Sequence, residues 1–241
     1  MAILQEHLRF FREIFSIKDF FGERIASIGV QEIRARRGGK MPKDFDYKNF
    51  KELLFARGVK AVDEFDYFDE KANIKFDFNR PIDKKYYEKY NTVIDIGSLE
   101  HIFDTKQAME NCLRMVKVNG FYFLHTPVNG YFKDGFHTFN PDAIIGALKS
   151  NGFQIIYEKY GTLRGKEIKN PAYGRDVNLW IVARKLKKID KFNIPQQEWW
   201  DEMLKEDWKS NWKQRVKRRE KNYLQKLIER LKIIWYAAGL Q

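Results

Sequence analysis

The chain has 241 residues, and its 45 Lys and Arg against 33 Asp and Glu give a net charge of +12. An apolar share of 44% excludes global disorder, and the single cysteine, Cys112, excludes both a disulfide framework and a multi-cysteine zinc site. No apolar run reaches the roughly 18 residues that span a bilayer, and residues 1–15 lack the uninterrupted apolar core of a signal peptide. We therefore expect a cytoplasmic protein, whose charge would suit nucleic acid, an anionic membrane or a phosphorylated substrate.

The positive charge is unevenly distributed along the chain. Two-thirds of the excess lies in residues 184–241, so the preceding part is only mildly basic. This separation indicates two differently built parts. We expect an N-terminal helix over 1–22, an α/β domain over 23–185 and a basic, Trp-rich helical tail over 186–241.

Hydrophobic periodicity predicts helices and strands in alternation. In chain order they are a helix over 2–21, a strand over 24–30, a loop over 34–46, a helix over 47–57, strands over 59–63, 74–78 and 92–96, a helix over 105–116, a strand over 121–125, a helix over 141–151, and strands over 153–157 and 177–183. This alternation predicts a mostly parallel sheet with helices on both faces. The last two strands have no clear helix between them, so we expect an antiparallel hairpin.

Candidate ligand contacts follow the strands, because a parallel sheet binds ligands beyond the carboxyl ends of its strands. Gly29 lets the backbone approach a ligand closely, but a single glycine does not make the Gly-x-Gly-x-x-Gly cradle of a pyrophosphate site. Asp63 ends the second predicted strand and could bind both hydroxyls of a ribose. Asp77 could accept from an exocyclic amine while Phe78 lies against a flat base. Alone, each aspartate is more readily explained as a turn former or helix cap, but together they favour a ligand site.

The middle of the chain carries an ordered set of motifs. Leu99-Glu100-His101 follows the fourth strand, Asn119-Gly120 and Pro127 flank the fifth, and His137-Thr-Phe-Asn-Pro141 and Ser150-Asn-Gly-Phe153 come later. In this order the chain resembles class I S-adenosylmethionine-dependent methyltransferases, in the branch with Leu-Glu-His after its fourth strand. That branch contains many small-molecule and glycan O-methyltransferases, and the resemblance covers about residues 23–185.

The resemblance implies a Rossmann-like, seven-stranded sheet and S-adenosyl-L-methionine as the cofactor. The contacts it implies are Gly29, Val30 and Gln31 in the first loop, Asp63 at the ribose, Asp77 and Phe78 at the adenine, and Gly97, Ser98 and Leu99 through their backbone. The first loop departs from the family pattern, because Ser27 stands at the usual acid and Gln31 and Ile33 replace later glycines. Side chains at those positions narrow the room for the methionine part of the cofactor.

A hydroxyl acceptor needs a base near neutral pH, and histidine is the natural candidate. His125 ranks first as a catalytic residue, because it lies at the end of the fifth strand nearest the expected acceptor. His101 and His137 follow. His101 could instead be a packed helix-start residue, and the aromatic loop 130–139 around His137 could be a substrate lid or a plug over the sheet edge. The spacing of these residues matches no specific metal-ligand pattern, so no metal is predicted.

We therefore predict O-methylation of a glycan or another small polar metabolite. A non-catalytic binding or scaffold protein with a methyltransferase fold is the first alternative, motivated by the first loop. An RNA-associated methyltransferase is the second, motivated by the basic tail. Nucleobase methylation is disfavoured, because the Asn/Asp-Pro-Pro-aromatic signature is absent after the fourth strand.

The tail carries a separate signal. Its apolar residues over 224–235 recur at helical spacing, with lysine and arginine on the other side. Such a helix could bind an anionic membrane surface through 196–241, or it could pack on its own domain or on a second copy in a homodimer. We favour packing slightly, since an apolar stripe usually belongs to a core, and we rank RNA binding third.

Overall fold

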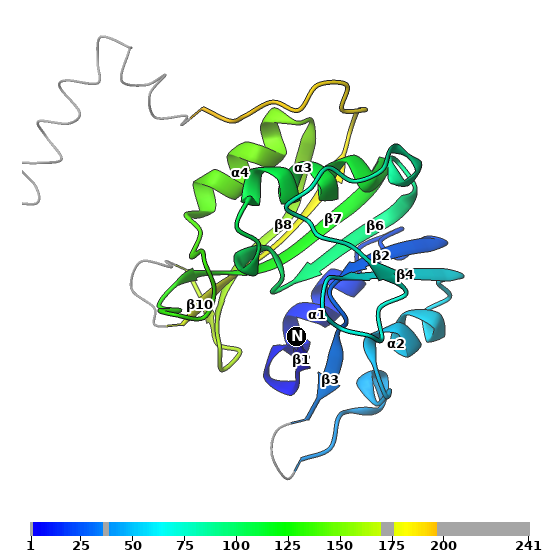
Figure 1. The fold of residues 1–241 in the computed structure, drawn as a ribbon. Helices are drawn as coiled ribbons and strands as arrows, with labels where there is room; N and C mark the ends of the chain where they lie inside the picture. The colour runs from blue at the N-terminus through cyan, green and yellow to red at the C-terminus, as the bar shows by residue number, and fades with distance from the viewer. Residues whose placement is uncertain (1, 36–38, 170–175, 197–241) are drawn as a thin grey trace, which may run out of the picture. The chain divides into compact units, whose positions relative to one another are not determined.

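Figure 1 shows the computed structural model, which describes residues 2–35, 39–169 and 176–196. Residues Met1–Pro195 form one compact unit. Its main sheet has eight strands, in spatial order β5 (Ile74–Lys75), β4 (Ala61–Asp66), β2 (Arg24–Ile28), β6 (Tyr90–Ile96), β7 (Val116–Asn129), β10 (Val177–Lys185), β8 (Phe153–Thr162) and β9 (Glu167–Ile168). A separate two-stranded sheet pairs β1 (Ala2–Leu4) with β3 (Glu32–Arg34).

The order of strands in the main sheet creates one topological switch point. The strands β5, β4, β2, β6 and β7 run parallel, and β10 is antiparallel to both β7 and β8. Chain order runs outward from β2 toward β5 on one side and from β6 toward β7 on the other. The predicted α/β class, the Rossmann-like, mostly parallel sheet and the antiparallel pairing of the last two predicted strands, now β8 and β10, are confirmed. The position between β2 and β6 is where such sheets bind ligands.

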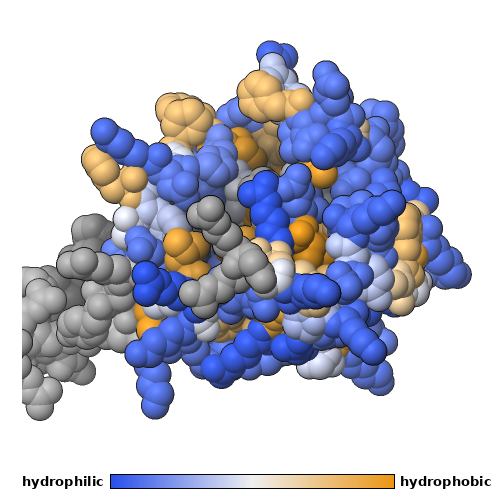
Figure 2. Space-filling model, turned by 90° about the horizontal axis from the view of Figure 1, so that it is seen from below, coloured by the Kyte–Doolittle hydropathy of each residue, from blue (hydrophilic) through white to orange (hydrophobic). Residues whose placement is uncertain are grey.

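Helices cover both faces of the sheet (Figure 1). The α-helices of the described residues are α1 (Leu8–Phe15), α2 (Phe50–Ala56), α3 (Thr105–Met115) and α4 (Pro141–Ser150). Their short 3-10 turns are η1 (Gln5–His7), η2 (Lys43–Phe45), η3 (Lys84–Tyr86) and η4 (Leu99–His101). One core packs α3 and α4 against the sheet, and the other packs α1 and α2 against the opposite face. Figure 2 shows that the face seen from below is largely hydrophilic, with hydrophobic side chains exposed in separate places.

Local sequence signals set where these helices begin. The side chains of Asn49, Asp104 and Asn140 accept hydrogen bonds from backbone N–H groups in the first turns of α2, α3 and α4. Each cap satisfies a donor that has no partner within its own helix. Pro141 opens α4, where its missing N–H costs nothing.

Three sequence predictions are wrong in their boundaries. The segment 2–21 is not one helix, because Ala2–Leu4 is a strand whose Ile3 is buried opposite Ile33. The fifth main strand begins at Val116 and contains Asn119-Gly120, which therefore does not end a helix. The main sheet has eight strands where seven were expected, because β9 adds a short pair at its edge.

The last described residues, 186–196, contact both α3 and α4. Asn193 donates from its backbone N–H to Asn151 Oδ1 at 2.9 Å and accepts from Asn151 Nδ2 at its carbonyl, also at 2.9 Å. The rest of the predicted helical tail lies outside the described residues. Within 2–35, 39–169 and 176–196, no helix combines the length and apolarity needed to cross a bilayer.

Gly165 tests how tightly the N-terminal segment packs on the β8–β9 turn. Its φ is +76°, and an added Cβ would overlap the carbonyl oxygen of Glu6. We expect Gly165→Ala to lower the free energy of unfolding by about 3 kcal/mol or more, from left-handed strain and overpacking together. Gly58→Ala is the matched control, since Gly58 has φ +88° and open space around it, and it should cost only about 1 kcal/mol. Equal losses in denaturant titrations would contradict this packing.

Candidate functional site

A cavity of about 480 Å³ opens beyond the carboxyl ends of β2, β4, β5 and β6. It therefore lies at the switch point, where the topology directs a ligand. Apolar and aromatic side chains form much of its wall, and a few polar groups converge on it. Its lining residues are Ile28, Gly29, Phe65, Asp66, Tyr67, Phe68, Phe76, Asp77, Phe78, Asn79, Ser98, His101, Ile102 and Phe136.

The backbone at the end of β2 is shaped for close approach. Gly29 has φ +82°, a conformation that side-chain-bearing residues rarely adopt, and its N–H donates to Phe65 O at 2.7 Å. Ser98, which follows the neighbouring strand β6, links it to the end of β2 by donating from its hydroxyl to Ile28 O at 2.7 Å. The predicted contacts Gly29 and Ser98 thus both line the cavity.

Asp66 is the carboxylate at the end of β4. Its Oδ1 accepts from the N–H groups of Phe68 and Asp69 at 2.8 and 2.9 Å, and its Oδ2 lies 3.4 Å from Val30 N. Burial alone would raise its pKa, but these donors outweigh burial and hold the pKa of Asp66 below its ordinary value. The carboxylate is therefore ionised at neutral pH and fixed in orientation, with lone pairs left for a ligand.

Asp63 was predicted to end its strand, but it does not. It lies inside β4, three residues before Asp66, because the buried Phe65 continues the strand beyond it. Its carboxylate accepts from Tyr90 Oη at 2.8 Å and pairs with Arg24 and Lys89 at 3.2 and 3.3 Å. Asp63 and its partners do not line the cavity, whereas Asp66 does. We therefore take Asp66 instead of Asp63 as the candidate ribose contact.

The two predicted contacts after β5, Asp77 and Phe78, lie where a ligand in the cavity could reach them. Asp77 and Phe78 both line the cavity. Hydrogen bonds from Asn79 hold the pKa of Asp77 below its ordinary value, so this carboxylate is also ionised. Phe78 is only 5% exposed and packs edge-on against Phe76 at 5.0 Å, which leaves Phe76 as the more accessible ring.

The side chain of Gln31 occupies the loop that follows β2. Gln31 is fully buried, and its Nε2 donates to Ile28 O and Ile96 O at 3.2 and 3.3 Å, joining β2 and β6 where the strand order reverses. Together with Val30 it lines a second cavity, of about 470 Å³, beside α2. Gly97 and Leu99 are absent from the lining of either cavity, so four of the nine predicted cofactor contacts meet at the first.

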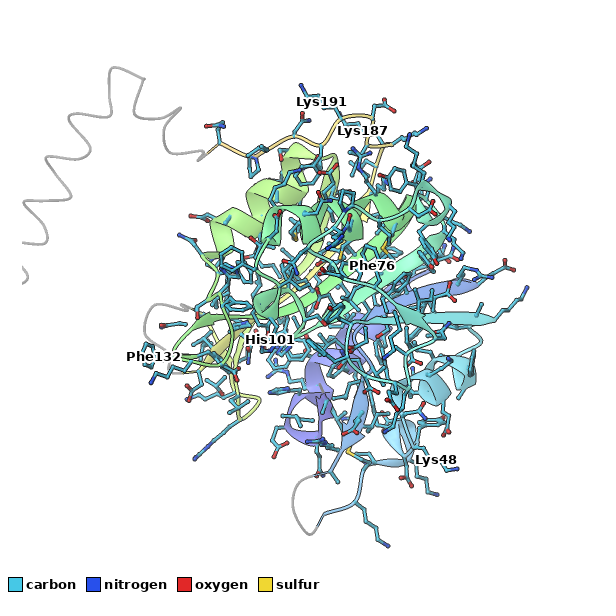
Figure 3. The ribbon with its side chains drawn as sticks, viewed as in Figure 1. Lys48, Phe76, His101, Phe132, Lys187 and Lys191 are labelled. Carbon is cyan, nitrogen blue, oxygen red and sulfur yellow. The ribbon has the colours of Figure 1, made fainter. Side chains whose placement is uncertain are left out.

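The three candidate histidines lie in different surroundings. His101 lines the cavity and is exposed. His137 Nε2 lies 3.1 Å from Phe103 O, where it can donate a hydrogen bond. His125 packs 4.1 Å from the Trp180 ring on the face covered by α1, and burial, with His7 nearby, lowers its pKa well below the ordinary value. Figure 3 labels His101 and Phe76, which reach the cavity from different strand ends.

Two buried carboxyl groups lie close together in the chain, Asp95 near the end of β6 and Glu100 within η4. Burial raises the pKa of Asp95 to about 7, and burial together with Asp95 raises the pKa of Glu100 to about 8. Asp95 Oδ1 accepts from Ser98 N at 2.9 Å, and Glu100 Oε2 accepts from Thr126 Oγ1 at 3.0 Å. Carboxyls with raised pKa values next to a cavity often mark functional sites.

Several residues of the cavity wall were not among the predicted site residues, notably Asp66, Phe76 and Phe136. A signal for Asp66 was present, since the apolar Phe65 extends the strand past Asp63. Phe136 lies in the aromatic loop 130–139, for which a substrate lid was one prediction, but no local signal placed its own ring at the cavity, because that depends on how the loop after β7 folds back. Among the described residues, no group of three His, Cys, Asp or Glu could hold a metal ion.

Several solved structures that are similar to this chain are methyltransferases. An S-adenosylmethionine-dependent methyltransferase from Archaeoglobus fulgidus is 16% identical, with 74% of this chain and 93% of that chain covered and a TM-score of 0.46. One from Mesorhizobium loti is 12% identical, with coverage of 75% and 98% and a TM-score of 0.48. The 1,6-didemethyltoxoflavin-N1-methyltransferase of Burkholderia thailandensis, solved with S-adenosylhomocysteine, is 14% identical, with coverage of 74% and 79% and a TM-score of 0.44.

The sequence itself matches no protein-family model and no curated protein. The strand order of the described residues fits the Rossmann-like fold that the class I methyltransferase resemblance implies, whereas the Leu-Glu-His branch stays a prediction.

Proposed function

We propose that the chain is an S-adenosylmethionine-dependent methyltransferase whose cofactor lies at the cavity beyond β2, β4, β5 and β6. The observation that supports this most is the conjunction of Gly29, Asp66 and Asp77 at three successive parallel strand ends around one cavity. Ionised carboxylates suit the hydroxyls of a ribose and the amine of a base, and the aromatic wall suits a flat ring.

The proposed roles of the chain's own residues are binding, orientation and proton transfer. Asp66 would hold ribose hydroxyls, and Phe76 and Ile102 would contact the base beside Asp77. When bound, the cofactor supplies an activated methyl group, so the protein mainly aligns the acceptor and excludes water. His101 is the base we propose for a hydroxyl acceptor, replacing His125 as first candidate because only His101 lines the cavity.

The acceptor we propose is a glycan or another small metabolite with a hydroxyl group, and the reaction is O-methylation. Its support is the motif resemblance around Leu99-Glu100-His101.

We further propose the cytoplasm as the compartment, since the single cysteine, Cys112, is a buried thiol. A membrane surface or a second copy as partner of residues 196–241 stays a proposal that liposome flotation and sedimentation would test.

The cofactor site is tested by two matched aspartate variants. We expect Asp66→Asn to weaken binding of S-adenosylhomocysteine at least tenfold in calorimetry, because a fixed, ionised acceptor is lost. Asp63→Asn changes the same group in the same strand but outside the cavity, and it should leave the affinity within about twofold. Absence of heat with the unmodified protein at millimolar ligand would overturn the proposed function.

A second candidate is a non-catalytic protein with a methyltransferase fold. The observation that favours it is Gln31, whose buried side chain occupies the first loop and joins β2 to β6. In that case S-adenosylhomocysteine binding would be absent in the unmodified chain and would appear when Gln31→Gly opens the loop. Binding to the unmodified chain would exclude this explanation.

A further inference from the structure

Two exposed phenylalanines pack against each other beside the cavity: Phe136 lines it, and Phe103 follows the lining residue Ile102 in the chain. Phe103 is 74% exposed and Phe136 is 67% exposed, and their ring centroids lie 5.7 Å apart at an interplanar angle of 86°. Phe136 also lines the cavity, next to His101 and Ile102. Large apolar side chains gathered in one exposed place usually mark a binding surface. We infer that Phe103 and Phe136 form an aromatic subsite that receives the ring of a neutral, phenol-like methyl acceptor.

The subsite is held in place from behind. The N–H groups of Phe136 and His137 donate to Glu100 O at 2.9 and 3.2 Å, and His137 Nε2 lies 3.1 Å from Phe103 O. Gly135 brings the loop against η4, because an added Cβ would lie 2.8 Å from Glu100 O. The two rings therefore come from separate segments that are joined by hydrogen bonds. A surface ordered in advance costs less conformational entropy on binding.

The geometry and charge of the mouth favour a neutral aromatic ring. An edge-to-face pair presents one ring face beside one ring edge, so a third ring can stack on the first and meet the second edge-on. The ionised Asp77 lines the same cavity and disfavours an anionic acceptor. A hydroxyl on such a ring would point toward His101, the base proposed above. This inference rests on the proposed function and narrows its acceptor from small metabolites in general to those with an aryl hydroxyl.

Phe132 provides a matched control on the same loop. It is 88% exposed and does not line the cavity, and unlike Phe103 it makes no ring contact with Phe136. Lys133 Nζ lies 5.5 Å from its ring. In Figure 3 it lies at the edge of the described structure, farther out than His101. Since Phe103, Phe132 and Phe136 are all largely exposed, replacing any of them by alanine should leave the fold intact.

The test is a titration of the full chain with phenol and, separately, with methyl glucoside, followed by saturation-transfer NMR. We expect phenol to bind and its Kd to rise at least fivefold in Phe103→Ala and in Phe136→Ala, with no change in Phe132→Ala. Equal phenol affinity in all three variants, or a preference for methyl glucoside, would overturn the aromatic subsite. Calorimetry with S-adenosylhomocysteine on the same samples separates the two proposals, because its failure removes the cofactor site and leaves the phenol result standing.

Discussion

Replacing His101 by glutamine should lower methyl transfer by about 10²- to 10⁴-fold, the usual contribution of a general base. His101 is the candidate histidine that lines the cavity, and it lies beside the exposed Phe136. Glutamine keeps hydrogen-bonding capacity but cannot take a proton from a hydroxyl acceptor. The measurement uses radiolabelled S-adenosylmethionine with a phenolic acceptor. Binding of S-adenosylhomocysteine should stay within about twofold, since the base acts on the acceptor.

His125→Gln is the comparison that separates position from residue type. His125 lies on the face covered by α1, packed against Trp180, so its loss can change stability without touching the cavity. We expect folded His125→Gln protein to retain transfer within about twofold. If transfer falls in this variant and persists in His101→Gln, the choice of base is wrong.

The sequence predicted the sheet well because strand interiors depend on local patterns. Short apolar runs such as 92–96 and 121–125 stay buried whichever way the loops fold, and both became central strands. The order of β2 and β6, and hence the place of the cavity, follows from the general topology of such sheets. Four predicted cofactor contacts accordingly lie around the cavity.

The remaining site residues depend on features that periodicity does not carry. Asp63 and Asp66 are both acids near one strand end. The apolar Phe65 between them was a signal that the strand continues, but its pairing with Ile74 is what shows that the strand reaches Asp66. His125 shares a face with Phe123 by the two-residue alternation of a strand, but sequence alone does not say which face borders the cavity. Phe103 and Phe136 are brought together by a loop that folds back on η4, an arrangement with no local signature.

Glu100 should make the protein less stable as pH rises, and Glu100→Gln should remove much of that dependence. The folded protein keeps the carboxyl proton up to about pH 8, whereas the ordinary pKa of 4.5 applies to the unfolded chain. Between these values the folded state binds more protons, so the free energy of unfolding falls with increasing pH. A shift of this size corresponds to about 3–5 kcal/mol once the window is crossed. The cause is burial beside Asp95, which hydrogen bonds from the backbone N–H of Glu100 and from Thr126 do not offset.

The measurement is urea unfolding of the full chain at intervals from pH 5 to pH 9. The unmodified protein should lose stability across this range, and Glu100→Gln should lose clearly less, because its amide is neutral throughout and still accepts from Thr126. Asp95, whose pKa is raised to about 7, keeps a residual slope in the variant at lower pH. Glu70→Gln is the control, since Glu70 is exposed and should leave the profile unchanged. Parallel profiles for the unmodified protein and Glu100→Gln would mean that Glu100 is already ionised in the folded state, and the cavity would then adjoin a buried negative charge.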